Sequence, residues 1–184
     1  MIGSVLFSLW FFLPAGVANM TPVFAAKIPV LSSLDTPLDG GLKLNGKRIF
    51  GDHKTVRGLI SGILLAILFV WLQQVLYTAQ PSWFGWSELD YRFVNPLIVG
   101  FLLGFGALGG DAFKSFFKRQ LGVKPGDSWF PFDQIDYILV AIIITAGIIT
   151  LPFVFYLFSI LLWICLHLVV SYIGFLLKLK EKPM

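Results

Sequence analysis

Cysteine and charge are both scarce in this sequence of 184 residues. The one cysteine, Cys165, lies inside a long apolar stretch, so the chain offers neither a disulfide framework nor a cysteine zinc cluster. Only 13% of the residues are charged and 57% are hydrophobic, whereas soluble domains carry about 25% charged residues. This composition excludes an ordinary soluble domain and predicts an integral membrane protein.

The N-terminal stretch is apolar from Met1 and lacks the positive segment that opens a signal peptide. We therefore interpret it as a retained first transmembrane helix. A span needs about 20 apolar residues. The sequence predicts a single all-α transmembrane domain, 1–184, with about five spans, at residues 2–26, 58–78, 96–113, 134–151 and 155–177.

The polar segments between the predicted spans differ in charge. Of the 14 lysines and arginines, all but Arg92 fall in the loop 27–57, the loop 114–132 or the C-terminal tail. Because basic loops stay on the cytoplasmic side of a membrane, we expect both loops and the C-terminus inside and the N-terminus outside. One long kinked helix in place of the last two spans would instead give four spans and leave the tail lysines outside; we prefer five.

The first cytoplasmic loop combines a turn signal with basic residues. Asn45-Gly46, flanked by short alternating segments, predicts a β-hairpin, and Asp52 or Thr55 is placed to cap the second span. Basic side chains near that helix N-terminus can bind phosphate. The alternative interpretation is anchoring at lipid head groups. The basic residues concerned are Arg48, Lys54 and Arg57.

An acidic residue, Asp111, lies near the end of the third predicted span, just before the second loop. If the third helix continues past Asp111, then Lys114, Ser115 and Lys118 share a face with it. Ionisable residues in this position are functional candidates, although an internal ion pair that holds the helix is the alternative.

Two further carboxylates, Asp133 and Asp136, lie three residues apart at the start of the fourth span. Asp133 could simply cap that helix, whereas Asp136 lies a turn further in. Carboxylates that converge among basic side chains suit Mg²⁺ together with phosphate groups. The sequence has no glycine-rich P-loop, so a phosphate site must be built in another way.

These residues resemble a family signature. Ser115-x-x-Lys118-Arg119, then Lys124 and Asp127, then Asp133-x-x-Asp136 is similar to the signature of the CDP-diacylglycerol synthase superfamily. The segments from Phe50 to Gly58 and from Gly110 to Asp136 look more specifically like the CDP-archaeol synthase branch. Two residues separate Lys124 from Asp127, and Gln134 stands where the broader signature has arginine. These departures favour the archaeal branch.

The resemblance implies a Mg²⁺-dependent cytidylyltransferase of the cell membrane, with its site facing the cytoplasm. Its substrates would be CTP and unsaturated archaetidic acid, an isoprenoid ether-lipid phosphate whose two chains lie in a groove open to the bilayer, with no nucleic acid partner. The implied metal ligands, for one or two ions, are Asp111, Asp133 and Asp136. The implied catalytic residues are these three with Lys118 and Arg119. The implied substrate-binding residues are Asn19, Asp52, His53, Lys54, Arg57, Lys114, Ser115, Lys124 and Asp127.

Three alternatives remain at this level. The chain could be a CDP-diacylglycerol synthase that acts on phosphatidic acid, a small ion-coupled transporter that uses the carboxylates and lysines as an ion relay, or a lipid-binding scaffold without catalysis. Against the transporter, the charges are expected at one membrane face, whereas transport sites usually lie near the midplane.

Overall fold

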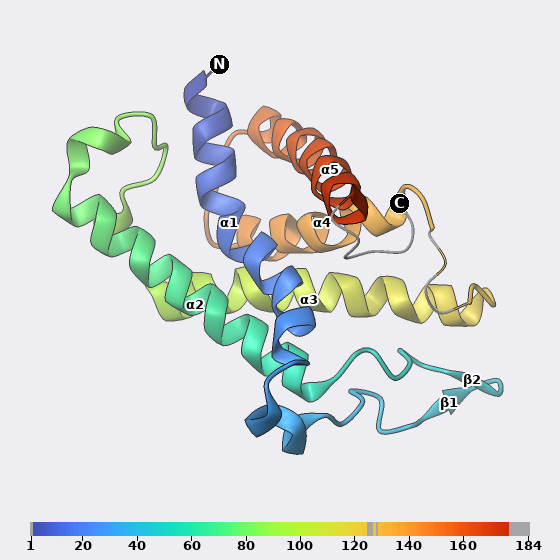
Figure 1. Cartoon of the computed structure of the whole chain (residues 1–184). Coiled ribbons are helices and arrows are strands. Elements are labelled where there is room, and N and C mark those ends of the chain that lie inside the picture. Colours follow the sequence, from blue (N-terminus) through green and yellow to red (C-terminus); the bar gives the residue numbers. More distant parts are fainter. Residues whose placement is uncertain (1, 125–126, 128, 177–184) are drawn as a thin grey trace.

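The computed structural model describes residues 2–124, 127 and 129–176 and is mainly helical (Figure 1). The predicted tail lysines lie outside these residues. The described α-helices are α1 (Ile2–Ala25), α2 (Val56–Ala79), α3 (Pro96–Gln120), α4 (Phe132–Ala146) and α5 (Phe153–Leu176). Short 3-10 helices η1 (Pro29–Leu34), η2 (Pro81–Phe84) and η3 (Tyr91–Phe93) and the strands β1 (Lys43–Leu44) and β2 (Lys47–Arg48) complete the described elements.

Four of the described helices, α1, α2, α3 and α5, are long and apolar enough to cross a membrane. Helix α4 has 15 residues, or about 22 Å at 1.5 Å per residue, which is less than the roughly 30 Å of a bilayer core. The four long apolar helices support the predicted class, an all-α membrane protein. The number of spans and their orientation stay predictions.

The helix ends differ in part from the predicted spans. Helix α3 continues to Gln120, so the first seven residues of the predicted loop 114–132 are helical. Lys118 and Arg119 lie in its last turn, where cationic side chains favour the helix dipole. Helix α4 ends at Ala146, before the predicted end of the fourth span at residue 151.

Helices α4 and α5 are separate, which excludes the single long helix considered as an alternative. The hydroxyl of Tyr156 donates to the carbonyl of Ile149 and accepts from the N–H of Leu151. These bonds tie the connection to the first turn of α5.

Capping side chains begin two of the helices, and for α2 the cap is Thr55, one of the two predicted candidates. The Thr55 hydroxyl accepts from the N–H of Gly58 at the start of α2. The Asn95 side chain accepts from the N–H groups of Leu97 and Ile98 at the start of α3, with Pro96 as the first helical residue. Capping side chains satisfy N–H groups that have no partner within the helix.

Helix α3 is central and packs against α1, α2 and α4. Its glycines allow this close packing. A Cβ atom on Gly100 would lie 2.4 Å from the Cα of Ile67 on α2, and one on Gly110 would lie 2.4 Å from the carbonyl oxygen of Asp136 on α4. The backbone of α4 is thereby held against the end of α3 that carries Asp111.

The long segment between α1 and α2 folds beside the C-terminal half of α3 (Figure 1). It contains the predicted hairpin, in which β1 pairs with β2 in antiparallel fashion. Asn45 and Gly46 have φ values of 51° and 78°, the left-handed backbone that an Asn-Gly hairpin turn requires.

Candidate active site

The buried carboxylate of Asp39 organises the α1–α2 loop. It accepts hydrogen bonds from the N–H groups of Gly41, Phe50 and Gly51 and from the guanidinium of Arg48. Burial acts to raise the pKa of Asp39, but the Arg48 guanidinium and the three N–H groups outweigh it and hold this pKa well below its usual range. The backbone leading into residues 52–54 is therefore fixed by one ionised side chain.

Asp39 is a residue for which the sequence predicted no role. Its only local signal is the Gly40-Gly41 pair that follows it, both in left-handed backbone, because aspartate before such a turn commonly accepts a bond from the N–H two residues on. That pattern indicates a turn. It does not reveal bonds to residues nine to twelve positions further along.

The loop is docked on the end of α3. The Nζ of Lys47 donates to the carbonyl of Gln120 over 2.6 Å, and the Gln120 amide donates to the carbonyl of Arg48 over 3.3 Å. A lysine near a helix C-terminus satisfies carbonyls that have no partner within the helix. Further along the loop, Lys54 forms an ion pair with Asp111 on α3.

Three aspartates from α3 and α4 surround one ammonium group. The Nζ of Lys114 lies 3.0 Å from Asp111 Oδ1, 3.1 Å from Asp133 Oδ1 and 2.9 Å from Asp136 Oδ2. The structure therefore brings together the carboxylates predicted from two separate sequence segments. It also contains the predicted i,i+3 ion pair between Asp111 and Lys114, as one contact within a larger cluster.

Lys118 extends the cluster. Its Nζ lies 3.1 Å from each Asp133 carboxylate oxygen and 2.6 Å from the carbonyl of Asp127. Asp133 also accepts from the N–H of Trp129, and the residue at the N-cap of α4 is Pro131. The carboxylate of Asp133 is therefore paired with Lys114 and Lys118. The interpretation of Asp133 as the N-cap of α4 is wrong, because Pro131 holds that position.

The carboxylates are suited by chemistry to a hard cation. As arranged among the described residues, no set of three His, Cys, Asp or Glu forms a ready metal site, since the Lys114 ammonium lies between the carboxylates. Asp136 Oδ2 is buried and, although it pairs with Lys114, makes no hydrogen bond of suitable geometry. An incompletely satisfied carboxylate beside two others fits a cation such as Mg²⁺.

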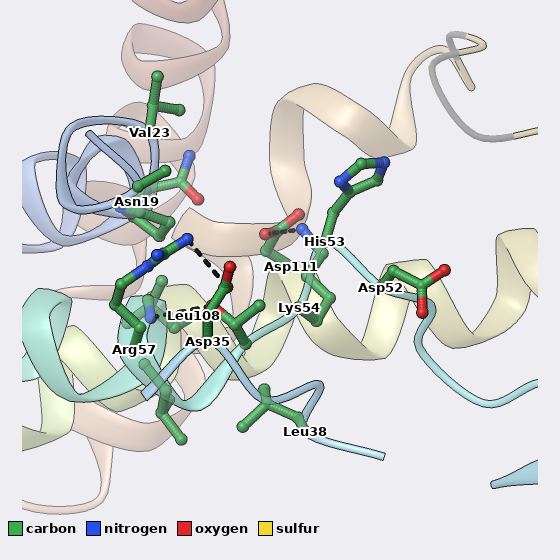
Figure 2. A pocket seen from close by; sticks show the side chains of 15 residues that line it. Asn19, Val23, Asp35, Leu38, Asp52, His53, Lys54, Arg57, Leu108 and Asp111 are labelled. Carbon is green, nitrogen blue, oxygen red and sulfur yellow. Dashed lines mark hydrogen bonds and ion pairs between the residues drawn. The ribbon is translucent and has the colours of Figure 1, made fainter. Parts of the chain in front are cut away.

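Two cavities meet at the Lys54–Asp111 ion pair and share four lining residues, Asp52, His53, Lys54 and Asp111. The first has a volume of about 430 Å³ and lies among α1, α2 and the loop (Figure 2). The second has a volume of about 500 Å³ and lies between the loop and the end of α3.

The second cavity is strongly basic. Its described lining holds seven lysines and arginines and two aspartates, so it is suited to a polyanion. The basic residues are Lys47, Arg48, Lys54, Lys114, Lys118, Arg119 and Lys124. The buried Nε of Arg119 has no hydrogen-bond partner among the described residues. Asp133 and Asp136 pair with Lys114 but are not among the described residues that line this cavity.

The remaining predicted site residues divide between the two cavities. Asn19 and Arg57 line the first, and Ser115 and Lys124 line the second. Arg57 pairs with Asp35, a residue for which the sequence predicted no role. Asp127 reaches the cluster through its backbone carbonyl.

Comparison with known proteins places the chain among archaeal lipid enzymes. A family model described as CarS-like, CDP-archaeol synthase, matches residues 1–184. The CDP-archaeol synthase of Methanopyrus kandleri is 36% identical over 184 residues, covering 95% of this chain and 91% of its own. That of Methanosarcina mazei is 39% identical over 162 residues, covering 80% and 89%. A solved intramembrane enzyme for archaeal membrane lipids biosynthesis is similar with a TM-score of 0.70 and 27% identity, over 91% of this chain and 94% of that one.

Proposed function

The chain belongs to the CDP-archaeol synthase family, and from this premise we propose how it acts. It is an enzyme of archaeal ether-lipid synthesis that forms CDP-archaeol by cytidylyl transfer. In our proposal the donor is CTP, the acceptor is unsaturated archaetidic acid, and pyrophosphate is released. The acceptor is a glycerol phosphate that bears two geranylgeranyl ethers.

The observation that carries this proposal is that carboxylates and basic side chains lie together at the C-terminal end of α3. Asp111, Asp133 and Asp136 are close enough to share the Lys114 ammonium, and the basic cavity begins at the same lysine. A reaction between two phosphate groups requires such a combination, because the negative charge of both must be neutralised as they approach.

The bond changes are simple. An oxygen of the lipid phosphate attacks the α-phosphorus of CTP, a new P–O bond forms, and the bond from the α-phosphorus to the bridging oxygen breaks as pyrophosphate leaves. The protein supplies positioning and charge stabilisation. We assign Lys114, Lys118, Arg119 and Lys124 to phosphate oxygens, with Lys54 and Arg57 contributing from the α1–α2 loop.

Asp111, Asp133 and Asp136 would hold one or two Mg²⁺ ions, which when bound would neutralise charge on the phosphates. For this the Lys114 ammonium must leave the carboxylates and is then free to pair with a phosphate. We assign contacts to the nucleotide or its surroundings to Asn19, Asp52, His53, Ser115 and Asp127.

Location at a membrane face also separates this proposal from ion transport. Asp111 lies in the C-terminal half of α3, and Asp133 lies in the first turn of α4, whereas transport sites usually lie near the bilayer midplane. We propose that this face is cytoplasmic, because the basic loops belong to it. The lipid substrate then explains why the enzyme is embedded in a membrane.

The test is turnover by purified protein in detergent with CTP, Mg²⁺ and synthetic geranylgeranyl-ether glycerol phosphate, following CDP-lipid formation. We expect product that disappears with EDTA and falls about a hundredfold or more in Asp133→Asn and Asp136→Asn. Asp90→Asn is the matched control, because Asp90 pairs with Arg92 away from the site. Folded protein that forms no CDP-lipid from isoprenoid or acyl substrates would overturn the proposal.

A further inference from the structure

Helix α1 contains two prolines, Pro14 and Pro22, and each removes one hydrogen bond from the helix. Proline has no N–H, so the carbonyl four residues earlier loses its usual donor. The two carbonyls released in this way belong to Trp10 and Ala18. In a membrane they have no water to bind, so each needs a partner from elsewhere in the protein.

The carbonyl released by Pro14 is bound by a side chain of α2. The amide of Gln73 donates to the carbonyl oxygen of Trp10, across 63 residues of sequence, and Gln73 is only 2% exposed. Burial of an amide in an apolar helix is costly unless the amide is hydrogen-bonded. One bond therefore satisfies both the buried amide of α2 and the carbonyl that the proline leaves without a donor.

The carbonyl released by Pro22 is covered in another way. A Cβ on Gly62 of α2 would lie 2.9 Å from the Ala18 carbonyl oxygen, and a Cβ on Gly58 would lie 3.0 Å from the Pro22 Cβ. The backbone of α2 thus lies directly against this part of α1. Such a contact contributes at most a weak C–H hydrogen bond, so the strong interhelical bond is the one at Trp10.

The N-terminal half of α1 is also fixed to α5. The Ser8 hydroxyl donates to the Ser159 hydroxyl over 2.9 Å, and the indole N–H of Trp163 donates to the Ser8 carbonyl over 3.3 Å. Both serines are fully buried. Figure 1 shows that α1 changes direction between its two halves. Gln73 therefore binds α1 where a fixed half meets the half that continues toward the site.

That second half of α1 carries Asn19, Pro22, Val23 and Ala26, which line the first cavity; Figure 2 shows Asn19 and Val23 there. At 1.5 Å per residue, Val23 lies about 14 Å beyond Pro14, so a change of about 10° in the bend at Pro14 moves it by about 2 Å. A displacement of about 1 Å at an active site can cost about a hundredfold in rate.

We propose that Gln73 is a positioning residue, which sets the bend of α1 at Pro14 and thereby places the α1 side of the active site. It acts through the Trp10 carbonyl and is not among the described residues that line either cavity. Its effect on turnover rests on the proposed function, whereas its effect on the shape of α1 does not.

The first measurement is a double-mutant cycle on thermal stability. Gln73→Met removes the donor and keeps a side chain of similar length. It should lower the melting temperature by about 3 °C or more, because the Trp10 carbonyl is left without its donor. In a Pro14→Ala background, the N–H at position 14 supplies that carbonyl, so the same change should cost about 1 °C or less. Equal losses in both backgrounds would overturn the proposal.

The second measurement follows the shape of α1 directly. Spin labels are attached at Phe24→Cys on α1 and Leu68→Cys on α2, two exposed positions, after Cys165→Ser has removed the native thiol. Gln73→Met and Pro14→Ala should each shift or broaden the distance between the labels by about 2 Å or more. A distance unchanged in Gln73→Met would show that the bond does not set the bend.

Gln74→Met is the matched control. The amide of this neighbouring glutamine donates to the carbonyls of Tyr91 and Val94 at the connection to α3, away from α1. Its loss should also lower the melting temperature, but it should leave the distance between the labels unchanged and kcat/KM within about twofold.

The third measurement is turnover. Gln73→Met is expected to lower kcat/KM about tenfold or more. The double variant with Pro14→Ala should stay impaired although its stability recovers, because a straightened α1 does not return the site residues to their places. Recovery of turnover together with stability would reduce Gln73 to a structural role. If the wild type forms no CDP-lipid, the proposed function fails, and the stability cycle and the distances still decide the role of Gln73.

Discussion

The ammonium group of Lys54 forms an ion pair with the carboxylate of Asp111, 57 residues further along the chain. Both side chains are about one-fifth exposed. This contact joins the α1–α2 loop to α3 at the boundary between the two cavities. It therefore has two separable consequences, one for the position of the loop and one for the chemistry beside it.

The first prediction concerns Asp111. Asp111→Asn is expected to lower kcat by about a hundredfold or more, because it removes one of the three carboxylates that converge near the phosphates. Steady-state CDP-lipid formation measures this, with Asp90→Asn as the control at full activity. A tenfold or smaller effect in well-folded protein would remove Asp111 from the metal ligands.

The second prediction separates docking from chemistry. Lys54→Asp combined with Asp111→Lys reverses the ion pair, so the loop should stay docked while activity remains lost. Limited proteolysis of the loop should be fast in Lys54→Asp alone and slow again in the double variant. If the double variant regained activity, the charges would act only through docking, and neither residue would have a direct role at phosphate or metal.

The third prediction concerns the Lys114 ammonium. Lys114→Met leaves Asp111, Asp133 and Asp136 without the cation that lies among them, so the protein without metal should be less stable and should bind Mn²⁺ more tightly. The melting temperature should rise with Mn²⁺ more in this variant than in wild type, because ligand binding to the folded state adds stability. Lys47→Met removes the same charge from the basic cavity away from the carboxylates and is the control.

The fourth prediction concerns Asp39 and pH. Its pKa is lowered by folding, so its contribution to loop stability is present above the unfolded pKa of about 3.9 and is lost as pH falls below that value toward the folded pKa. Asp39→Asn should destabilise the loop by about 2 kcal/mol at neutral pH, since it replaces a charged acceptor of several bonds.

A fluorescent label on the β1–β2 hairpin would follow loop release in this experiment. Release of the wild-type loop should begin only below about pH 4, and this acid step should be missing in Asp39→Asn. An identical acid transition in both proteins would mean that another carboxylate controls the loop.

The fifth prediction uses two adjacent glycines. A Cβ on Gly110 would lie 2.4 Å from the Asp136 carbonyl oxygen, whereas a Cβ on Gly109 would meet nothing within 4 Å. Gly110→Ala should therefore push α4 from α3, cost about 1–3 kcal/mol of stability and misplace Asp136. Gly109→Ala should be neutral or stabilising by up to about 1 kcal/mol, because alanine favours a helix. Thermal unfolding and turnover of both variants would decide, and equal effects would contradict the packing argument.

Local features of the fold could be predicted because short segments determine them. The hairpin follows from Asn45-Gly46, whose backbone adopts left-handed angles, and the start of α2 follows from capping by Thr55. The end of α3 was harder to predict, since the apolar run stops near residue 113 while the helix continues to Gln120. Hydrophobicity marks where lipid contact ends, which is not where a helix must end.

The candidate site was predicted in its members but not in its arrangement. Spacing placed Asp111 and Lys114 on one helical face, and the structure pairs them. It could not indicate that Lys114 also reaches Asp133 and Asp136, because those contacts depend on how closely α3 and α4 approach at Gly110. Asp39 was missed for a similar reason, since its partners at residues 48–51 meet it only after the loop has closed.

The sequence by itself determined that this is a helical membrane protein with basic loops and with acidic residues at helix ends, because composition, charge distribution and short-range periodicity are properties of the chain alone. The tertiary structure alone decided that Lys54 meets Asp111, that one ammonium lies among three carboxylates, and that two cavities of different chemistry flank the loop. The physical reason is that these contacts join residues far apart in sequence, and their geometry is set by the packing of α1, α2, α3 and α4.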